Sequence, residues 1–173
     1  MTARAEHPAS GRLALLAECG DLVVAIDAMS ILQIRRVDET TERAVNRRLS
    51  VLQLGGEREA ALVAGWDLGK LLGIEMSASA WLIVELPGPD RRVGFRVGRC
   101  VTVQPLPVCR ALPRAIFTRR SQAIVAAFST AAIPELTDHV SGIVVDLARV
   151  LGAGELAAMA KLGKEGRATA LEL

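Results

Sequence analysis

The chain has 173 residues, of which 51% are hydrophobic, and its 21 basic and 19 acidic residues leave a net charge of only +2. Such a length and apolar content can fill one ordinary domain or two very small barrels that share a core, which excludes a disordered chain. The near balance of charge predicts no overall field that would attract nucleic acid or an anionic membrane surface.

The chain has three cysteines, Cys19, Cys100 and Cys109. Their number is odd and their spacings do not suggest a disulfide framework, which favours reduced thiols. Residues 1–11 carry charged side chains and lack the continuous apolar run of a secretory signal. No stretch of about 18 uninterrupted apolar residues occurs. We therefore expect a flexible N-terminal tail over residues 1–11, no membrane insertion and a cytoplasmic location.

The N-terminal part predicts a hairpin. Leu13–Ala17 and Leu22–Ile26 are apolar runs that flank the turn Cys19-Gly20-Asp21. Asp27 then opens a short helical turn that runs into another strand, and Arg35-Arg36 marks the return of that strand to solvent.

A charged connection and a second hairpin follow. We expect Val37–Ser50 to be a surface loop or a short exposed helix because charged residues dominate it. Val51–Leu54 and Ala60–Trp66 are predicted strands on either side of Gly55-Gly56.

The clearest hairpin joins Trp81–Leu86 to Arg92–Val97 across Pro87-Gly88-Pro89-Asp90. Val93, Phe95 and Val97 alternate with Gly94 and Arg96, which predicts one buried and one wet face. Val101–Val103 is expected to continue the same sheet until Pro105.

The remainder predicts a loop, two strands and a helix. Pro113 opens a loop that carries Arg114, Arg119 and Arg120, and Ala123–Phe128 and Ser141–Val145 are strands. A terminal helix over Gly154–Leu162 is expected to fray from Gly163 onward. Short strands every 8 to 12 residues predict an all-β barrel or sandwich.

One phrase occurs twice. Asp67–Gly73 and Asp146–Gly152 both read Asp-Leu-x-(Lys/Arg)-aliphatic-Leu-Gly, and each follows an apolar stretch. We assign structural roles to both ends of each copy, because the Asp can cap the amides of the next turn and the Gly can end that turn in a left-handed conformation. Two similar halves are predicted. Capping also accounts for the two Asp residues better than paired catalytic carboxylates do.

Residues for chemistry are scarce. There are two histidines, His7 and His139, and no tyrosine, and no cysteine or histidine pair has metal-ligand spacing. Gly65–Lys70 resembles a phosphate loop but has one residue too few between its glycines and Leu71 at the hydroxyl position. We predict no catalytic, cofactor or metal site. Trp66 is either core or the lining of a partner groove.

Four arginine pairs, at residues 35–36, 47–48, 91–92 and 119–120, fall on predicted loops or strand ends. Their simplest interpretation is a solvated surface. A nucleic-acid surface would need interleaved aromatic residues, and the chain has only three Phe and two Trp. A protein partner with acidic patches fits better, since guanidinium groups form forked bonds to carboxylates.

Four segments, in order, are similar to the motifs of one known family. Leu13–Arg36 is similar to the family's opening strands, and Val63–Gly73 to its Pro-Val-Val-Asp-Leu-x-x-Leu-Leu-Gly segment. Trp81–Val103 resembles the next hairpin, with its Val-Gly-x-x-Val-Asp-x-Val core, and Gly142–Leu151 resembles the closing Val-Leu-Asp-Leu-x-x-Leu-Leu. Over about residues 12–152 the chain therefore resembles the CheW-like domains, the adaptor fold of bacterial chemotaxis.

The resemblance implies an all-β fold of two five-stranded SH3-like barrels around a shared core, with short connecting helices and a C-terminal helix. The expected division is a tail over 1–11, a CheW-like domain of two intertwined barrel subdomains over 12–152, and a C-terminal helix and tail over 153–173. It implies no catalysis. It implies an adaptor that joins a chemotaxis-type histidine kinase to methyl-accepting receptors, with barrel faces for the kinase and a groove between the barrels for a receptor helix.

The chain departs from the family where the receptor-facing residues stand. The family has Asn-Leu-Arg-Gly, whereas Gln53-Leu54-Gly55-Gly56 is the nearest match, so the Arg that faces the methyl-accepting receptor in the family is not at its place. Arg58, in the lengthened turn, is a candidate substitute. The family's Asp after the Val-Gly-x-x-Val strand is replaced near Arg99 and Cys100. The predicted partner-binding residues are Gln53, Gly55, Gly56, Arg58, Val63 and Trp66.

Other functions stay open at this point. One is a ligand-sensing regulatory β-barrel, and another is a CheW-like protein that has lost kinase and receptor coupling and binds an unrelated partner. An RNA-binding SH3-like barrel would need the arginine pairs on one face. A groove of exposed aliphatic residues, open at both ends, would favour a peptide helix, and a closed pocket with convergent polar groups would favour a ligand.

Overall fold

The computed structural model describes residues 11–55, 61–88, 91–112 and 122–171, with side chains as far as Leu162. Residues 1–10 of the predicted tail, Gly56, Arg58 and the loop that Pro113 opens lie outside the described residues. The strands are β1 (Leu13–Cys19), β2 (Leu22–Asp27), β3 (Ile31–Arg36), β4 (Thr41–Ala44), β5 (Leu49–Leu54), β6 (Ala61–Asp67), β7 (Ala80–Glu85), β8 (Arg92–Val97), β9 (Cys100–Pro105), β10 (Arg110–Ala111), β11 (Ile124–Ser129) and β12 (Ser141–Val145). The α-helices are α1 (Leu68–Leu72), α2 (Leu147–Val150) and α3 (Ala153–Leu171), and short 3₁₀ turns cover Ala28–Ser30, Val37–Glu39 and Pro134–Leu136.

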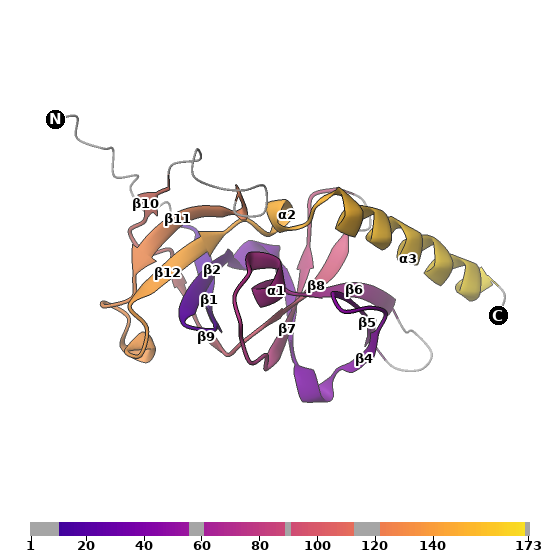
Figure 1. Ribbon diagram of the computed structural model, residues 1–173, viewed down its shortest axis with the longest axis horizontal. Coiled ribbons are helices and arrows are strands. Elements are labelled where there is room, and N and C mark those ends of the chain that lie inside the picture. The colour runs from indigo at the N-terminus through magenta and orange to yellow at the C-terminus, as the bar shows by residue number, and fades with distance from the viewer. Residues whose placement is uncertain (1–10, 56–60, 89–90, 113–121, 172–173) are drawn as a thin grey trace.

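The strands form two sheets of six, which lie side by side (Figure 1). Sheet A has the order β10-β11-β12-β2-β1-β9, and sheet B has the order β3-β7-β8-β6-β5-β4. The all-β class is confirmed, and each sheet has six strands where the family resemblance implied five for each barrel.

The two sheets have the same topology. Read from its other edge, sheet A is β9-β1-β2-β12-β11-β10, and each of its strands then matches one strand of sheet B. Each sheet has one parallel pair in the middle, β12 with β2 and β6 with β8. Even the registers agree, since Val144 lies opposite Ala25 where Gly65 lies opposite Gly94. One half therefore consists of β1 and β2 together with β9–β12, and the other half consists of β3–β8.

Three apolar clusters follow from this arrangement. One lies between the sheets and includes Leu15, Val24, Leu82 and Phe95. A second belongs to sheet A alone and includes Leu16, Phe128 and Leu136, and a third belongs to sheet B and consists of the buried residues Leu52, Trp81 and Ile83. Both faces of each sheet are thus partly covered, as expected for two small barrels that share a core.

Several expectations along the chain are wrong. The charged segment Val37–Ser50 contains strand β4, because the hairpin of β4 with β5 satisfies its backbone hydrogen bonds. Strand β9 pairs with β1 in sheet A and does not continue the sheet of β7 and β8. The second face of β8 is not wet, since a Cβ at Gly94 would lie 2.5 Å from Leu52 and since Arg96 stacks on the ring of Trp81 at 4.9 Å.

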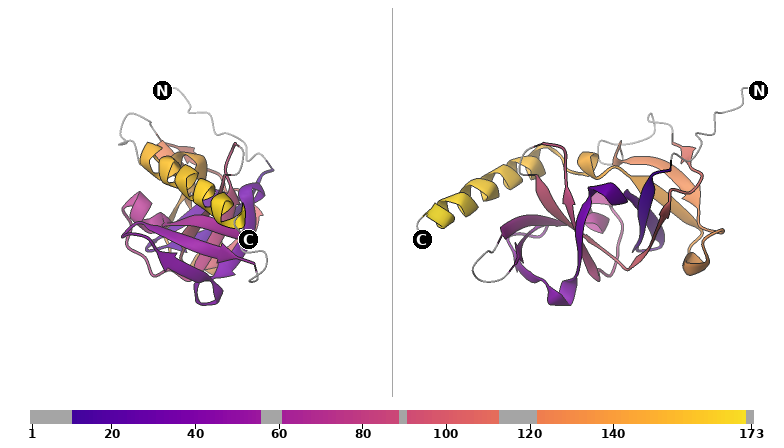
Figure 2. Two further views of the ribbon diagram at one scale, coloured as in Figure 1. Left: turned by 90° about the vertical axis from the view of Figure 1, so that its right-hand side faces the viewer. Right: turned by 180° about the vertical axis from the view of Figure 1, so that it is seen from behind.

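The terminal helix also differs from its prediction. Helix α3 continues to Leu171 and does not fray at Gly163. Its partly buried residues Leu156, Met159 and Leu162 pack against the shared cluster, and the helix lies along β6. Beyond this contact α3 projects from the end of the molecule (Figure 2).

The repeated phrase begins alike in both halves and ends differently. Asp67 caps α1, and its Oδ1 accepts a hydrogen bond from the Lys70 amide at 2.9 Å. Asp146 caps α2 in the same way, through the Ala148 amide at 3.1 Å. Gly73 ends α1 in the left-handed conformation with φ of 75°.

The left-handed end predicted for Gly152 is wrong. Leu151, in extended conformation, follows α2, and the Gly152 amide donates to Oε2 of Glu155 at 3.0 Å. A glutamate that bonds the amide three residues before it is half of a capping box. The second glycine therefore starts α3 and does not close α2.

Candidate functional site, a pocket between the two sheets

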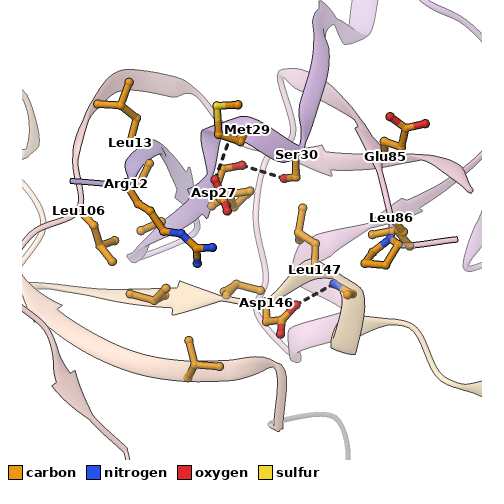
Figure 3. Close-up of a pocket in the computed structure, with 18 residues that line it drawn as sticks. Arg12, Leu13, Asp27, Met29, Ser30, Glu85, Leu86, Leu106, Asp146 and Leu147 are labelled. Carbon is orange, nitrogen blue, oxygen red and sulfur yellow. Dashed lines mark hydrogen bonds between the residues drawn. The ribbon is translucent and has the colours of Figure 1, made fainter. Parts of the chain in front are cut away.

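A pocket of about 590 Å³ opens where the two sheets meet. Its walls come from the start of β1, the end of β2, the end of β7 and the turn from β12 into α2, as Figure 3 shows. The labelled lining residues are Arg12, Leu13, Asp27, Met29, Ser30, Glu85, Leu86, Leu106, Asp146 and Leu147. Leu106 and Val125 also line it, so six separate segments of the described chain build the pocket.

The pocket is mainly apolar and its rim is exposed. Met29 is 85% exposed, Leu13 45% and Val125 37%. Leu86 and Leu147, by contrast, are buried and form part of the wall. An exposed methionine beside leucines and valines is an adaptable apolar surface of the kind that binds peptides.

Carboxylates dominate the charge of the pocket. In the described part of the chain, Asp27, Glu85 and Asp146 line it together with one cation, Arg12. Arg12 reaches toward the middle of the pocket from the segment before β1, and Asp27 and Asp146 belong to facing walls (Figure 3). The resulting excess of negative charge favours a partner with a basic residue at this place.

Three polar residues of the pocket, Asp27, Ser30 and Asp146, already have structural partners. Oδ1 of Asp27 accepts the Met29 amide at 3.0 Å, and the Ser30 hydroxyl donates to the Asp27 carbonyl oxygen at 2.7 Å. Asp146 spends one oxygen on its cap and the other on Arg149, whose Nε lies 3.1 Å away. A serine whose hydroxyl donates to a backbone carbonyl does not have its proton directed to a neighbouring base, so it is not activated as a nucleophile. The arrangement suits binding more than acid–base chemistry.

Within the described residues, no group of three or more His, Cys, Asp or Glu side chains could hold a metal ion. The cysteines are free thiols, as their odd number predicted. Burial raises the pKa of Cys19 to about 11, and its Sγ lies 3.4 Å from Sδ of Met76. Burial also raises the pKa of Cys100 and of Cys109. Raised pKa values leave little thiolate, so these thiols are poor nucleophiles.

None of the described residues predicted to bind a partner lines this pocket. Gln53 and Gly55 lie at the end of strand β5, and Gly55 has a φ of 95°. Val63 is 4% exposed and Trp66 2%, and the indole belongs to the shared cluster between the sheets. Of the two roles predicted for Trp66, core residue or lining of a partner groove, burial in the core accounts for its position fully. A partner-binding role for this hairpin stays a prediction.

The pocket residues were missed because no local pattern marks them. Leu13, Asp27, Glu85 and Leu147 come from four segments that are far apart in the sequence, and Asp27 and Leu147 lie close only because β2 pairs in parallel with β12. The repeated phrase singled out Asp146, although for capping alone. Non-local pairing of this kind has no short-range signature.

In the part of the chain that the structure describes, no helix has the length and apolarity needed to cross a membrane. No protein-family model and no curated protein matches the chain.

The fold is that of the CheW scaffolding proteins. The chain is similar in structure to the scaffolding protein TtCheW from Thermoanaerobacter tengcongensis, whose crystal structure superimposes with a TM-score of 0.61 at 16% sequence identity. The likeness covers 84% of this chain and 96% of that protein. The resemblance drawn from four short segments is therefore confirmed for the fold.

Proposed function

We propose that the protein is a non-enzymatic, cytoplasmic adaptor of a bacterial chemosensory pathway. It holds a chemotaxis-type histidine kinase together with a methyl-accepting receptor or another protein. The observation that carries the proposal is the whole-length likeness to a scaffolding protein.

An adaptor needs two separate binding surfaces, and two exposed features of the fold support the proposal. The pocket between the sheets is the first. The second is edge strand β3 of sheet B, on which Leu32 and Ile34 are 48% and 47% exposed. Exposed apolar residues on an unpaired edge suit association with another sheet. We assign the pocket to the receptor or its substitute, and the β3 edge to the kinase.

A ligand-sensing barrel is the second candidate. One observation favours it, since about 590 Å³ lies within the range of small-molecule pockets. The polar groups weigh against it, because Asp27 and Asp146 are committed to capping. The exposed apolar rim favours a protein partner.

The test is capture of partners from a lysate of the encoding organism, with mass spectrometry as readout. Ala148, exposed and at the pocket rim, is replaced by Trp to obstruct the pocket. Ala157→Trp, on the exposed side of α3, is the matched control. Recovery of a chemotaxis-type kinase with all three proteins, and loss of a second partner with Ala148→Trp alone, supports the proposal. If no kinase or receptor is enriched by the wild-type protein, the adaptor function is wrong.

A further inference from the structure

The equivalence of the two halves gives the pocket a counterpart. Leu86 and Pro87 in the pocket wall correspond to Cys19 and Gly20, because the hairpin of β7 and β8 matches that of β1 and β2. Ala148, in the second copy of the repeated phrase, corresponds to Gly69 in the first.

Backbone hydrogen bonds confirm that the correspondence extends to the rim of the pocket. The Leu106 amide donates to the Arg12 carbonyl oxygen at 3.0 Å beside the pocket. At the equivalent place in the other half, the Val37 amide donates to the Ser79 carbonyl oxygen at 3.1 Å. The two sites therefore have equivalent walls, equivalent rims and the same strand register.

The counterpart site is filled by the chain itself. The carbonyl oxygen of Glu75 lies against Gly20, so closely that a side chain at Gly20 would collide with it. A Cβ at Gly69 would lie 2.6 Å from the Ile74 carbonyl oxygen and 2.9 Å from Cγ of Met76. Met76 also reaches Cys19, at 3.4 Å between the two sulfur atoms.

The filling segment is strand-like. Residues 74–79 belong to no helix or strand. Their burial alternates, with Ile74, Met76 and Ala78 half-buried and the residues between them exposed. A period of two is that of an extended chain with one face turned inward. Ile74 and Met76 pack against the cluster between the sheets.

The chain takes different courses after the two copies of the repeated phrase, and within the described residues one site is filled and the other is open. Gly73 turns the chain back in left-handed conformation, and the Ile74 amide donates to the Gly69 carbonyl oxygen at 2.7 Å. Gly152 starts α3 instead, with its amide bonded to Glu155. Helix α3 leads the chain away along β6, and none of the described residues after α2 lines the pocket.

We propose that the pocket is the docking site for a strand-like segment of a partner protein, with aliphatic or methionine side chains at alternate positions, in the place that Ile74–Met76 takes in the other half. The inference rests on the proposed function, in which the pocket binds the second partner. Among the described residues, three carboxylates and one guanidinium line the pocket. The exposed residue between the two apolar ones is therefore basic in the preferred partner.

The test uses the intact protein labelled with ¹⁵N and an acetylated, amidated peptide with the sequence of residues 73–79, in which Glu75→Lys supplies the basic residue. The expected result is saturable chemical-shift change at the amides of Ala14, Ile26 and Val144–Ala148. A second peptide that also carries Ile74→Ser and Met76→Ser binds at least about tenfold more weakly, since both apolar anchors are lost.

Two protein variants and one further peptide complete the design. Ala148→Trp weakens binding of the first peptide at least about tenfold, and the matched Ala157→Trp leaves it unchanged. A stapled peptide of the same composition held as a helix binds more weakly than the flexible one. Shift changes at Cys19, Gly20 and Gly69 in place of the pocket, or tighter binding of the helical peptide, would overturn the inference.

Failure of the inference and failure of the adaptor function are distinguishable. If the peptide gives no shift at the pocket up to millimolar concentration while Ala148→Trp still loses a partner in the lysate capture, strand-like recognition is wrong and the adaptor function stands. If the peptide binds as expected and no kinase or receptor is captured, the recognition mode stands and the adaptor function is wrong.

Discussion

Replacement of Met76 by alanine removes the side chain that fills the counterpart of the open pocket. Met76 is half-buried, contacts Cys19 and lies beside Gly69. Met29 provides the opposite case on the same protein, because it is 85% exposed at the rim of the pocket. The two Met→Ala variants therefore differ in environment and not in the atoms deleted.

The expected effect follows from burial. Deletion of a fully buried methionine to alanine costs about 2–5 kcal/mol, as lost transfer free energy and a residual cavity. A half-buried side chain loses about half of this, so Met76→Ala should lower the free energy of unfolding by about 1–2.5 kcal/mol. Met29→Ala should change it by less than about 0.5 kcal/mol, as surface substitutions do.

The assay is urea unfolding followed by circular dichroism, with the slope of the transition checked for equality among the three proteins. A shift of the midpoint for Met76→Ala alone supports the assignment of residues 74–76 to the counterpart site. Equal midpoints for all three proteins would show that the segment does not pack there in solution, and the reasoning from the filled half to the open one would fail.

Three further perturbations test other parts of the account. Asp67→Ala should cost about 1 kcal/mol of stability in urea titration through loss of the α1 cap, and an unchanged midpoint would contradict that role. Gly65→Ala should cost about 1–3 kcal/mol, because its Cβ would lie 2.8 Å from the ring of Trp81; a thermal midpoint equal to wild type would refute this packing. The hydrogen bond from Arg99 lowers the pKa of Glu18 from its ordinary value of 4.5, so the stability that this carboxylate contributes is present above pH 4.5 and is lost as pH falls through the lowered value. Glu18→Gln should therefore destabilise the protein at pH 7 and have no effect at the acid end of a pH series of unfolding curves, and an equal loss at both ends would contradict the ion pair.

Local patterns predicted most of the strands. The hairpins of β1 with β2, β5 with β6 and β7 with β8 are marked by apolar runs on either side of turn residues. The repeated phrase correctly indicated two halves. Its Asp residues were correctly predicted as helix caps, because capping depends on only a few neighbouring residues. Strand β4 was missed because its charged residues resemble a loop and gain their partner only from β5.

Sheet membership and the pocket could not be predicted in the same way. Strand β9 follows β8 closely in the chain, yet it pairs with β1 about 85 residues earlier, and no local signal records such a crossover. The pocket depends on that topology. Gly73 ends a helix whereas Gly152 starts one. This difference could have been predicted from Glu155, which stands at the position that completes a capping box.

The most direct test of the adaptor function is a bridging measurement by analytical ultracentrifugation. It uses the purified protein, a chemotaxis-type histidine kinase and a receptor cytoplasmic fragment from the encoding organism, in pairs and all together. The account predicts that kinase and receptor fragment sediment as one complex when the protein is present and separately when it is absent. Separate sedimentation of kinase and receptor fragment in the presence of saturating protein would contradict it.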